Sequence, residues 1–470
     1  MQAGVLMIVI VYLIGMLAVG LYANTRLNKT SEDYLLASRA LPAIMVAASL
    51  SANNIGGGSC VGVASRVYGP WGISAGWYVL AAGIGIVPMA FLAKALRKTL
   101  AFTIPEVVGK RFGAPSHVIT SVVNILAMFA LTAGQMGASG TIISAITGLP
   151  LNTAILAAGV VCIAYTVVGG LWADAISDFV QWIVLFFGLL IALPFVISNA
   201  GGWSAIVSKV PPAKLSLTAL GWPMILSLCF NYFVTFVSGP EMVSRIYAAK
   251  NEEEGFKATL MSALFMGVYA FVPALIGLAA FAVFPTINGN LAMATAATKL
   301  VPPVIGGLIC SAIISATLSS ADSDMLCAST IIVKDLYQKY IHPDCPDRTI
   351  MTMTKAFNVV VGLLALWVAL FQINIITLNT FAFMLRSAGP FAAFALGLVW
   401  KGASRNSGIV SIILGSIGGI WWQSRPADLQ FGIMPIVIGS AISCVAFVLT
   451  TVAEKAMGGE SAPMLEDIPK

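Results

Sequence analysis

Charged residues are scarce in this chain of 470 residues: they make up 9% of it, while hydrophobic residues make up 59%. Soluble domains carry roughly 25% charged residues, so an ordinary soluble protein is excluded. Only two histidines are present, His117 and His342, too few and too far apart to suggest a metal centre. The seven cysteines include no Cys-x-x-Cys pair, so neither a disulfide framework nor a zinc site is expected.

What the sequence has instead is a series of apolar runs, each long enough to cross a bilayer. They predict an all-α polytopic membrane protein with about thirteen spans of roughly twenty residues each. The net charge of +6 does not indicate nucleic-acid binding, because the basic residues are expected in loops between spans. Lipid is the expected surroundings, and no oligomeric state is predicted. We expect one transmembrane domain, with an extra helix and loop at 1–40, core spans over 41–238 and 219–400, and two final helices at 401–470.

The distribution of basic residues predicts the orientation. Most lysines and arginines fall in alternate loops, which the positive-inside rule assigns to the cytoplasm. The N-terminus is then outside and the C-terminus is cytoplasmic. The first apolar run, 3–23, lacks a basic n-region and a small-residue cleavage site, so we expect a span and not a signal peptide. A multi-pass protein of a prokaryotic inner (plasma) membrane is the expectation.

The stretch Ser311–Asp335 carries the strongest functional signal. Small residues and hydroxyls share one helical face with Asp322, whereas Asp324 lies on roughly the other side. An ionisable group at membrane depth costs between about 3 and 15 kcal/mol, so it is read first as functional. Hydroxyl oxygens beside a carboxylate suit Na⁺ or a proton relay. The alternative is a close-packed helix interface whose hydroxyls bond their own carbonyls.

Two spans look interrupted. One break is predicted at Asn53–Gly58, where three successive glycines weaken the helix. The other is predicted between Asn231-Tyr232 and Gly239-Pro240-Glu241. The two spans are five apart, as in an inverted repeat, and broken helices in matching halves point to a substrate site near the bilayer midplane. The alternative at the glycines is a close helix crossing.

Several local signatures, in order along most of the chain, resemble the sodium:solute symporter family. They are Asp33-Tyr34-Leu35-Leu36 with Ser38-Arg39, Gly169-Gly170-Leu171-Trp172-Ala173 with Ser177-Asp178 and Gln181, Gly239-Pro240 with Arg245 and Ala248-Ala249-Lys250, Ala316–Tyr337, and Gly389-Pro390 with Trp400 and Arg405-Asn406. The resemblance implies a LeuT-like core of five plus five helices, preceded by one span and followed by two.

The resemblance also implies a Na⁺ site. Its ligands would be the backbone carbonyls of Ala52, Ile55 and Ala316 and the hydroxyls of Ser319 and Ser320. Such hard oxygens suit Na⁺ without any carboxylate.

In some relatives Asp178 belongs to a second, more cytoplasmic site, which in this chain would include Asp322 and Ser323. Asp322 departs from the family's pattern. It either strengthens a second cation site, carries a coupled proton, or pairs with Arg386.

The solute is expected between the spans that contain the two breaks and their neighbours. The resemblance and the polar or aromatic character of these positions predict a lining of Asn54, Gly56, Ser59, Trp77, Tyr78, Gln135, Tyr232 and Arg386. For Trp77 and Tyr78 ordinary packing is the alternative. Arg386 is read as the one buried positive charge, and if it faces the solute it favours a carboxylate.

The function predicted from these features is Na⁺-coupled symport of a small organic solute by alternating access, with a carboxylate or an amino acid as the candidate solute. Na⁺ is the expected coupling ion. Proton coupling through Asp322 and Asp178 on the same fold is the first rival, and a non-transporting membrane sensor is the second. An enzyme is not expected, because no nucleophile–base pair or metal-ligand set lies at membrane depth.

Overall fold

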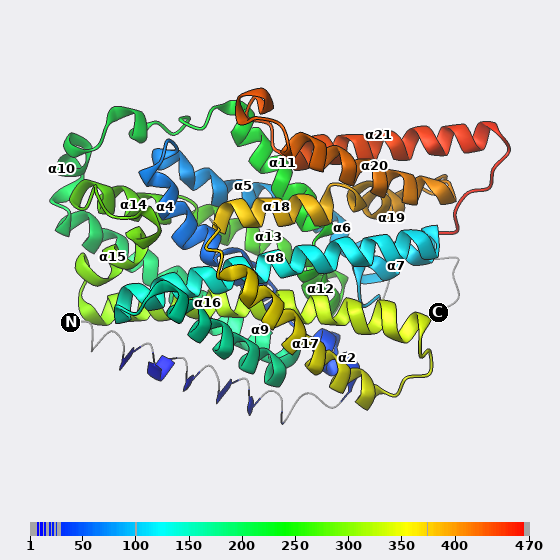
Figure 1. Ribbon diagram of the computed structural model, residues 1–470, viewed down its shortest axis with the longest axis horizontal. Coiled ribbons are helices and arrows are strands. Elements are labelled where there is room, and N and C mark those ends of the chain that lie inside the picture. The colour runs from blue at the N-terminus through cyan, green and yellow to red at the C-terminus, as the bar shows by residue number, and fades with distance from the viewer. Residues whose placement is uncertain are drawn as a thin grey trace.

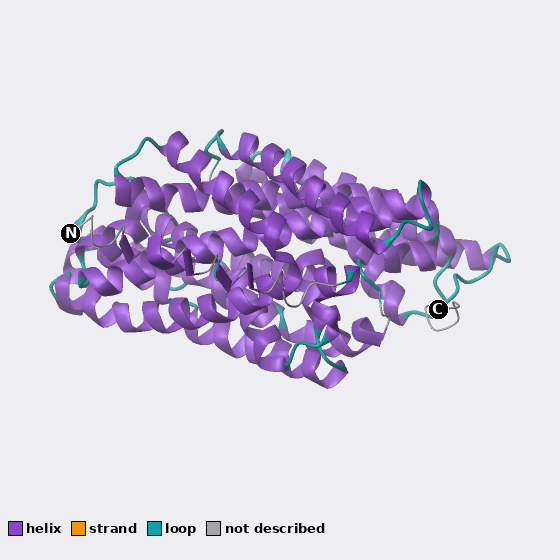
Figure 2. Ribbon diagram, turned by 90° about the horizontal axis from the view of Figure 1, so that it is seen from below, coloured by secondary structure: helices purple, strands orange, loops and turns teal. Residues whose placement is uncertain are grey.

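The computed structural model describes residues 30–98, 101–373 and 375–464, with scattered positions between 7 and 25. Of the predicted first span, 3–23, the structure describes only scattered positions. Almost everything described is helix (Figure 2), and the described part contains no β-strand, only two isolated bridges. This confirms the predicted all-α class.

In chain order, the helices that position the site are α2 (Ser31–Leu36), α3 (Ala43–Asn54), η2 (Gly58–Gly62), α4 (Val63–Tyr68), η3 (Gly72–Gly76), α5 (Trp77–Gly85), α6 (Val87–Lys98), α7 (Ile104–Phe112), α8 (Ala114–Thr147), α9 (Leu151–Asn199), α10 (Gly202–Lys209), η4 (Pro212–Leu215), α11 (Trp222–Ser238), α12 (Pro240–Ala248), α13 (Glu252–Tyr269), α14 (Val272–Val283), α15 (Ala292–Lys299), α16 (Pro303–Thr330), η6 (Ile331–Gln338), α17 (Asp347–Ala369), α18 (Ile375–Ser387), η7 (Ala392–Leu396), α19 (Gly397–Val399), α20 (Arg405–Gln423) and α21 (Pro435–Ala456).

Among the residues described, seven helices are long and apolar enough to cross a membrane, or nine if each of two bent pairs forms one span. The chain is therefore a multi-pass membrane protein. The predicted number of thirteen spans stays a prediction, since several predicted spans are divided into shorter helices.

One predicted boundary differs. Two spans are expected from the sequence to meet at Gly169-Gly170, but α9 continues through these residues and includes two apolar stretches, Leu151–Val167 and Asp174–Asn199. Each glycine costs a helix only about 1 kcal/mol relative to alanine, so packing of the long helix can override it.

Both predicted interruptions are present. Helix α3 ends at Asn54 and helical structure resumes beyond Ile55. Helix α11 passes unbroken through Asn231 and Tyr232, but α11 and α12 meet at Gly239 at an angle of 54°. A third bend, of 46°, separates α18 from η7 and α19 near Gly389-Pro390.

The polar helix α16 lies at the centre of the fold. It packs against α8, α9 and α17 and also touches α3 and α12, and of all the apolar spans it is the most buried. Helices α20 and α21 pack on each other along one edge of the molecule (Figure 1). This arrangement places both helix breaks beside α16.

Candidate functional site

The break after α3 exposes backbone oxygens. Ile55 N donates to Ser51 O at 2.8 Å, which is the last bond of the helix. Gly57 N then donates sideways to Gln135 Oε1 on α8 at 3.1 Å. Among the described residues no donor reaches the carbonyl of Ala52. Unwound backbone of this kind supplies oxygens to a cation in the membrane.

The glycines at the break allow close approach to the neighbouring helices. A Cβ on Gly57 would lie 2.4 Å from the Cβ of Ala138, and one on Gly56 would lie 3.1 Å from Ser320 Oγ. The segment therefore contacts α8 on one side and α16 on the other. The close helix crossing considered for these glycines is present, and their place in a cation or solute site stays a prediction.

Ser320 links α16 to the break. Its hydroxyl donates to Ala316 O at 2.8 Å and to Asn53 O at 3.3 Å. The carbonyl of Ile55 receives only the weak Cys60 thiol, at 3.7 Å. Of the five predicted Na⁺ ligands, the structure thus brings four to this junction of α3 and α16.

The fifth, Ser319, turns elsewhere. Its hydroxyl bonds Asp174 Oδ1 at 3.1 Å and also Asp178 Oδ1, both on α9. Asp174 and Asp178 are one helical turn apart and fully buried. Ser49 on α3 bonds the second oxygen of Asp178. These contacts form a carboxylate cluster, which is Asp174 and Asp178 with their hydroxyl partners.

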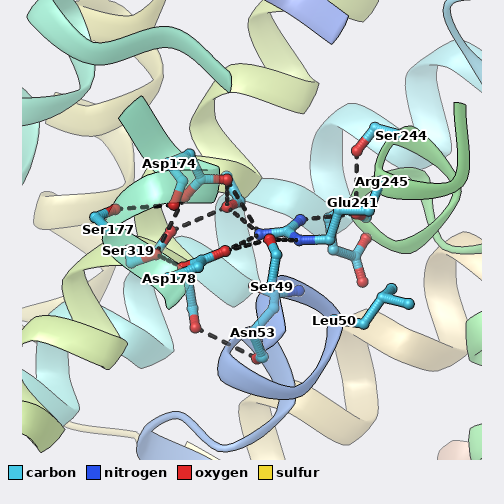
Figure 3. Close-up of polar contacts among 12 residues, drawn as sticks. Ser49, Leu50, Asn53, Asp174, Ser177, Asp178, Glu241, Ser244, Arg245 and Ser319 are labelled. Atoms are coloured by element: carbon cyan, nitrogen blue, oxygen red, sulfur yellow. Dashed lines mark hydrogen bonds and ion pairs between the residues drawn. The ribbon is translucent and has the colours of Figure 1, made fainter. Parts of the chain in front are cut away.

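Arg245 on α12 reaches into this cluster (Figure 3). Its Nη2 lies 3.1 Å from Asp174 Oδ2, 3.0 Å from Asp178 Oδ2 and 2.8 Å from Ser323 Oγ. Its Nε donates to Ser49 Oγ at 2.6 Å. One guanidinium therefore joins α12 to α3, α9 and α16 in a buried, charge-assisted network.

This position corrects two expectations. The positive-inside count places Arg245 in a cytoplasmic loop, and the sequence reading makes Arg386 the one buried positive charge. Arg245 is instead 1% exposed, and Arg111 is 2% exposed. Counting basic residues by loop cannot detect them, because both lie on short helices packed inside the protein, α12 and α7.

Asp322 stands apart from its predicted partners. Neither of its oxygens has a hydrogen-bond partner in the described part of the chain, although the residue is buried. The third possibility for it, a pair with Arg386, is wrong: Arg386 Nη1 donates to Glu241 Oε2. Thus Asp178 and Ser323 are joined through Arg245, while Asp322 is not.

A narrow central cavity, partly open to solvent, lies next to the break. Polar, aromatic and charged side chains line it together. The lining comprises Asn53, Asn54, Gly56, Gly58, Ser59, Tyr78, Leu131, Gln135, Tyr232, Thr235, Phe236, Glu241, Met242, Asp324, Asn379, Phe383 and Arg386. Seven of the eight predicted substrate residues are among them.

Trp77 is the eighth, and it lies outside this lining. Its indole Nε1 donates to Leu217 O at 2.9 Å, and its ring packs against Trp222 and Phe271. Trp77 therefore packs against its neighbours, which was the alternative considered for Trp77 and Tyr78. Tyr78 faces the cavity, where its ring meets Tyr232 edge-on at 5.4 Å between centroids.

Sequence reasoning missed several polar residues of this region. Asp174 precedes Asp178 by one turn, so the spacing alone could have placed both on one face. Glu241 follows the predicted break directly, and Asp324 lies two residues beyond Asp322. No local signal pairs Glu241 with Arg386, which are 145 positions apart.

Comparison with known proteins gives consistent results. The model of the sodium:solute symporter family matches residues 34–415. The sodium/proline symporter of Haemophilus influenzae is 26% identical, covering 93% of this chain and 92% of that protein. The sodium/glucose cotransporter of Vibrio parahaemolyticus is 26% identical, covering 91% and 86%. A solved Na⁺-coupled sialic acid symporter in a substrate-bound outward-open state has a TM-score of 0.84 at 20% identity, covering 98% of this chain and 99% of that one, and so shares its fold.

Proposed function

The chain belongs to the sodium:solute symporter family, and we propose that it imports a small organic solute by coupling it to Na⁺ bound between α3 and α16. The ligands are the carbonyls of Ala52, Ile55 and Ala316 and the hydroxyls of Ser320 and Ser319. The observation that carries this proposal is the contact of Ser320 Oγ with Asn53 O, beside an Ala52 carbonyl that has no donor in the described chain. Ser319 must leave Asp178 to join the ion.

The same break supplies both the ion site and the solute cavity. Asn53, Asn54 and Gly56 line the cavity, and the backbone next to them faces Ser320. Na⁺ that holds α16 against the break would therefore fix the shape of the cavity wall. Because coupling between two ligands is reciprocal, solute in the cavity would strengthen Na⁺ binding by the same factor. Release follows when the two repeats rock and the break separates from α16.

The solute site consists of the predicted lining residues other than Trp77. The names of similar proteins do not select the solute, because relatives equally identical to this chain are named for proline and for glucose. Proline is zwitterionic and glucose is neutral, so the chemistry of this cavity must decide.

Proton coupling is the second candidate, and Asp322 favours it. Asp178 and Ser323 already bond Arg245, so of the predicted second site only Asp322 is open to a proton or another cation. A buried carboxylate without partners is costly when ionised. We assign Asp322 as the group that would carry a coupled proton.

The orientation is part of the proposal. With most basic residues on one side, the N-terminus lies outside and the C-terminus in the cytoplasm of a plasma membrane. Import then requires Na⁺ to enter from the side of the N-terminus.

Thermal unfolding of the purified protein in Na⁺ or in K⁺ at equal ionic strength, across a range of pH, tests the coupling ion. A ligand that binds only the folded state raises the apparent melting temperature. We expect stabilisation by Na⁺ and not by K⁺. Stabilisation that follows pH in both salts, and that disappears in Asp322→Asn, would replace Na⁺ coupling with proton coupling.

A further inference from the structure

The central cavity is lined by three acidic or basic side chains, each from a different helix. Glu241 comes from α12, Asp324 from α16 and Arg386 from α18, and all are at least 97% buried. Two carboxylates therefore face one guanidinium. When all three are ionised the lining carries one negative charge in excess. At membrane depth such an excess is expensive unless a cation compensates it.

Arg386 is already engaged by Glu241. Its Nη1 donates to Glu241 Oε2. Its Nη2 lies 3.0 Å from where a Cβ would be on Gly239, at the junction of α11 and α12. The guanidinium carbon sits 5.0 Å from the centre of the Phe383 ring. The Nε and Nη2 of Arg386 have no hydrogen-bond partner among the described residues, so the pair with Glu241 leaves these two donors unused. The solute therefore meets Asp324 as well as Arg386 in this cavity.

Asp324 is the uncompensated group. Its carboxylate makes no hydrogen bond within the described residues, yet it lines the cavity. The charges of Glu241 and Asp174 repel it and those of Arg386 and Arg245 attract it. Both arginines are already paired with other carboxylates, Arg386 with Glu241 and Arg245 with Asp174 and Asp178. A positively charged group in the cavity would pair with the Asp324 carboxylate.

The rest of the lining also suits a cation. Four aromatic rings border the cavity: Tyr78, Tyr232, Phe236 and Phe383. Aromatic faces attract ammonium groups, most strongly when water is excluded. Two amide oxygens of the lining, Asn53 Oδ1 and Asn379 Oδ1, have no donor among the described residues. They can accept hydrogen bonds from a solute N–H.

We propose that the solute is a small organic cation, a protonated or quaternary amine, whose positive group sits beside Asp324 among these rings. This inference rests on the proposed function, since it names the solute of the same cavity. It predicts that the site recognises a positively charged group on the solute.

The test compares probes of matched size on the full-length protein in lipid nanodiscs with saturating Na⁺. Propylammonium and tetramethylammonium are the cationic probes, propionate is the anionic probe and 1-propanol is the neutral one. The apparent melting temperature against probe concentration gives an apparent Kd for each. We expect stabilisation by at least one ammonium probe, with an apparent Kd at least tenfold below those of propionate and 1-propanol.

Variants then locate the charge. Asp324→Asn should raise the apparent Kd of the ammonium probe at least tenfold while stabilisation by Na⁺ alone persists, which also shows that the variant is folded. Asp344→Asn, at an exposed loop residue, is the matched control and should change neither. If Asp324→Asn does not fold, the comparison of ammonium with propionate on the unaltered protein still decides.

Three outcomes would overturn the proposal: propionate stabilising as well as propylammonium, no ammonium probe stabilising a protein that responds to Na⁺, or an ammonium response unchanged by Asp324→Asn. If Na⁺ does not raise the apparent melting temperature of the unaltered protein, the proposed Na⁺ coupling is contradicted instead. The same probes in K⁺ would then still report the charge preference, so the two failures are distinct.

Discussion

Arg245 Nη2 lies 3.0 Å from Asp178 Oδ2, and this ion pair is fully buried. It joins α12, which follows the second helix break, to α9. The sequence suggests a second exchangeable cation at Asp178. In this structure a guanidinium that belongs to the protein lies at that position. The pair thus connects the two halves of the core in this structure.

Arg245→Gln should therefore destabilise the protein strongly. Removing one partner of a buried pair leaves an uncompensated charge, which costs about 3–5 kcal/mol. In this cluster two carboxylates, Asp174 and Asp178, would be left. The expected result is a clear fall in the apparent melting temperature in detergent, followed by tryptophan fluorescence.

Arg348→Gln is the control, because Arg348 is exposed at the start of α17. It should unfold like the unaltered protein. Adding Asp178→Asn to Arg245→Gln removes one of the two stranded charges and should recover part of the loss. Equal stability of Arg245→Gln and the unaltered protein would contradict the structural role of the pair.

Ser320→Ala should weaken Na⁺ binding. The change deletes the one side-chain oxygen that contacts Asn53 O at the break, while the helix keeps its backbone bonds. We expect the Na⁺ concentration for half-maximal stabilisation to rise at least tenfold, equivalent to ~1.4 kcal/mol, with little change of stability in K⁺.

Ser311→Ala is matched to this variant. Ser311 is a buried serine of the same helix whose hydroxyl bonds only Gly307 O, at 2.6 Å. Its loss should leave the Na⁺ response intact. An unaltered Na⁺ response in Ser320→Ala would remove Ser320 from the site.

Sequence reasoning located the local features of this fold. The break at Asn53–Gly58 was predictable because consecutive glycines weaken a helix wherever it packs. The opposite directions of Asp322 and Asp324 follow from helical spacing. The pairs Arg245–Asp178 and Arg386–Glu241 were not predictable, since each joins residues distant in sequence. The positive-inside rule describes where most arginines lie; it misplaces Arg245, which is buried, whereas Arg386 is buried as the sequence predicts.

Gly57→Ala should destabilise the break. The added methyl would meet the Ala138 Cβ at 2.4 Å and Gln135 Oε1 at 3.0 Å, so α8 must shift. Overpacking of this kind costs about 1–3 kcal/mol, and the apparent melting temperature should fall. Gly137→Ala is the control: it lies on α8 with nothing within 4 Å of its Cβ position, so it should be neutral or slightly stabilising. Equal behaviour of the two would mean that the break does not pack on α8.

Lys214 caps the C-terminal end of α4, the helix that follows the break at Asn53–Gly58. From η4 its Nζ donates to Val67 O at 2.8 Å and to Tyr68 O at 2.9 Å, and it also bonds Gly69 O. These are carbonyls at the end of α4, where a helix lacks backbone donors and a lysine is favourable. Lys214→Met keeps the length of the side chain but leaves the carbonyls without this donor.

The loss should amount to about 1–3 kcal/mol, as for other hydrogen bonds to charged groups, and the apparent melting temperature should fall accordingly. Lys209→Met changes an exposed lysine at the end of α10 and should leave stability unchanged. Because α4 lies beyond the break, away from Ser320, the half-maximal Na⁺ concentration should be the same in both variants. A raised Na⁺ requirement in Lys214→Met would mean instead that α4 moves with the ion site, so that the two halves of the broken helix act as one element.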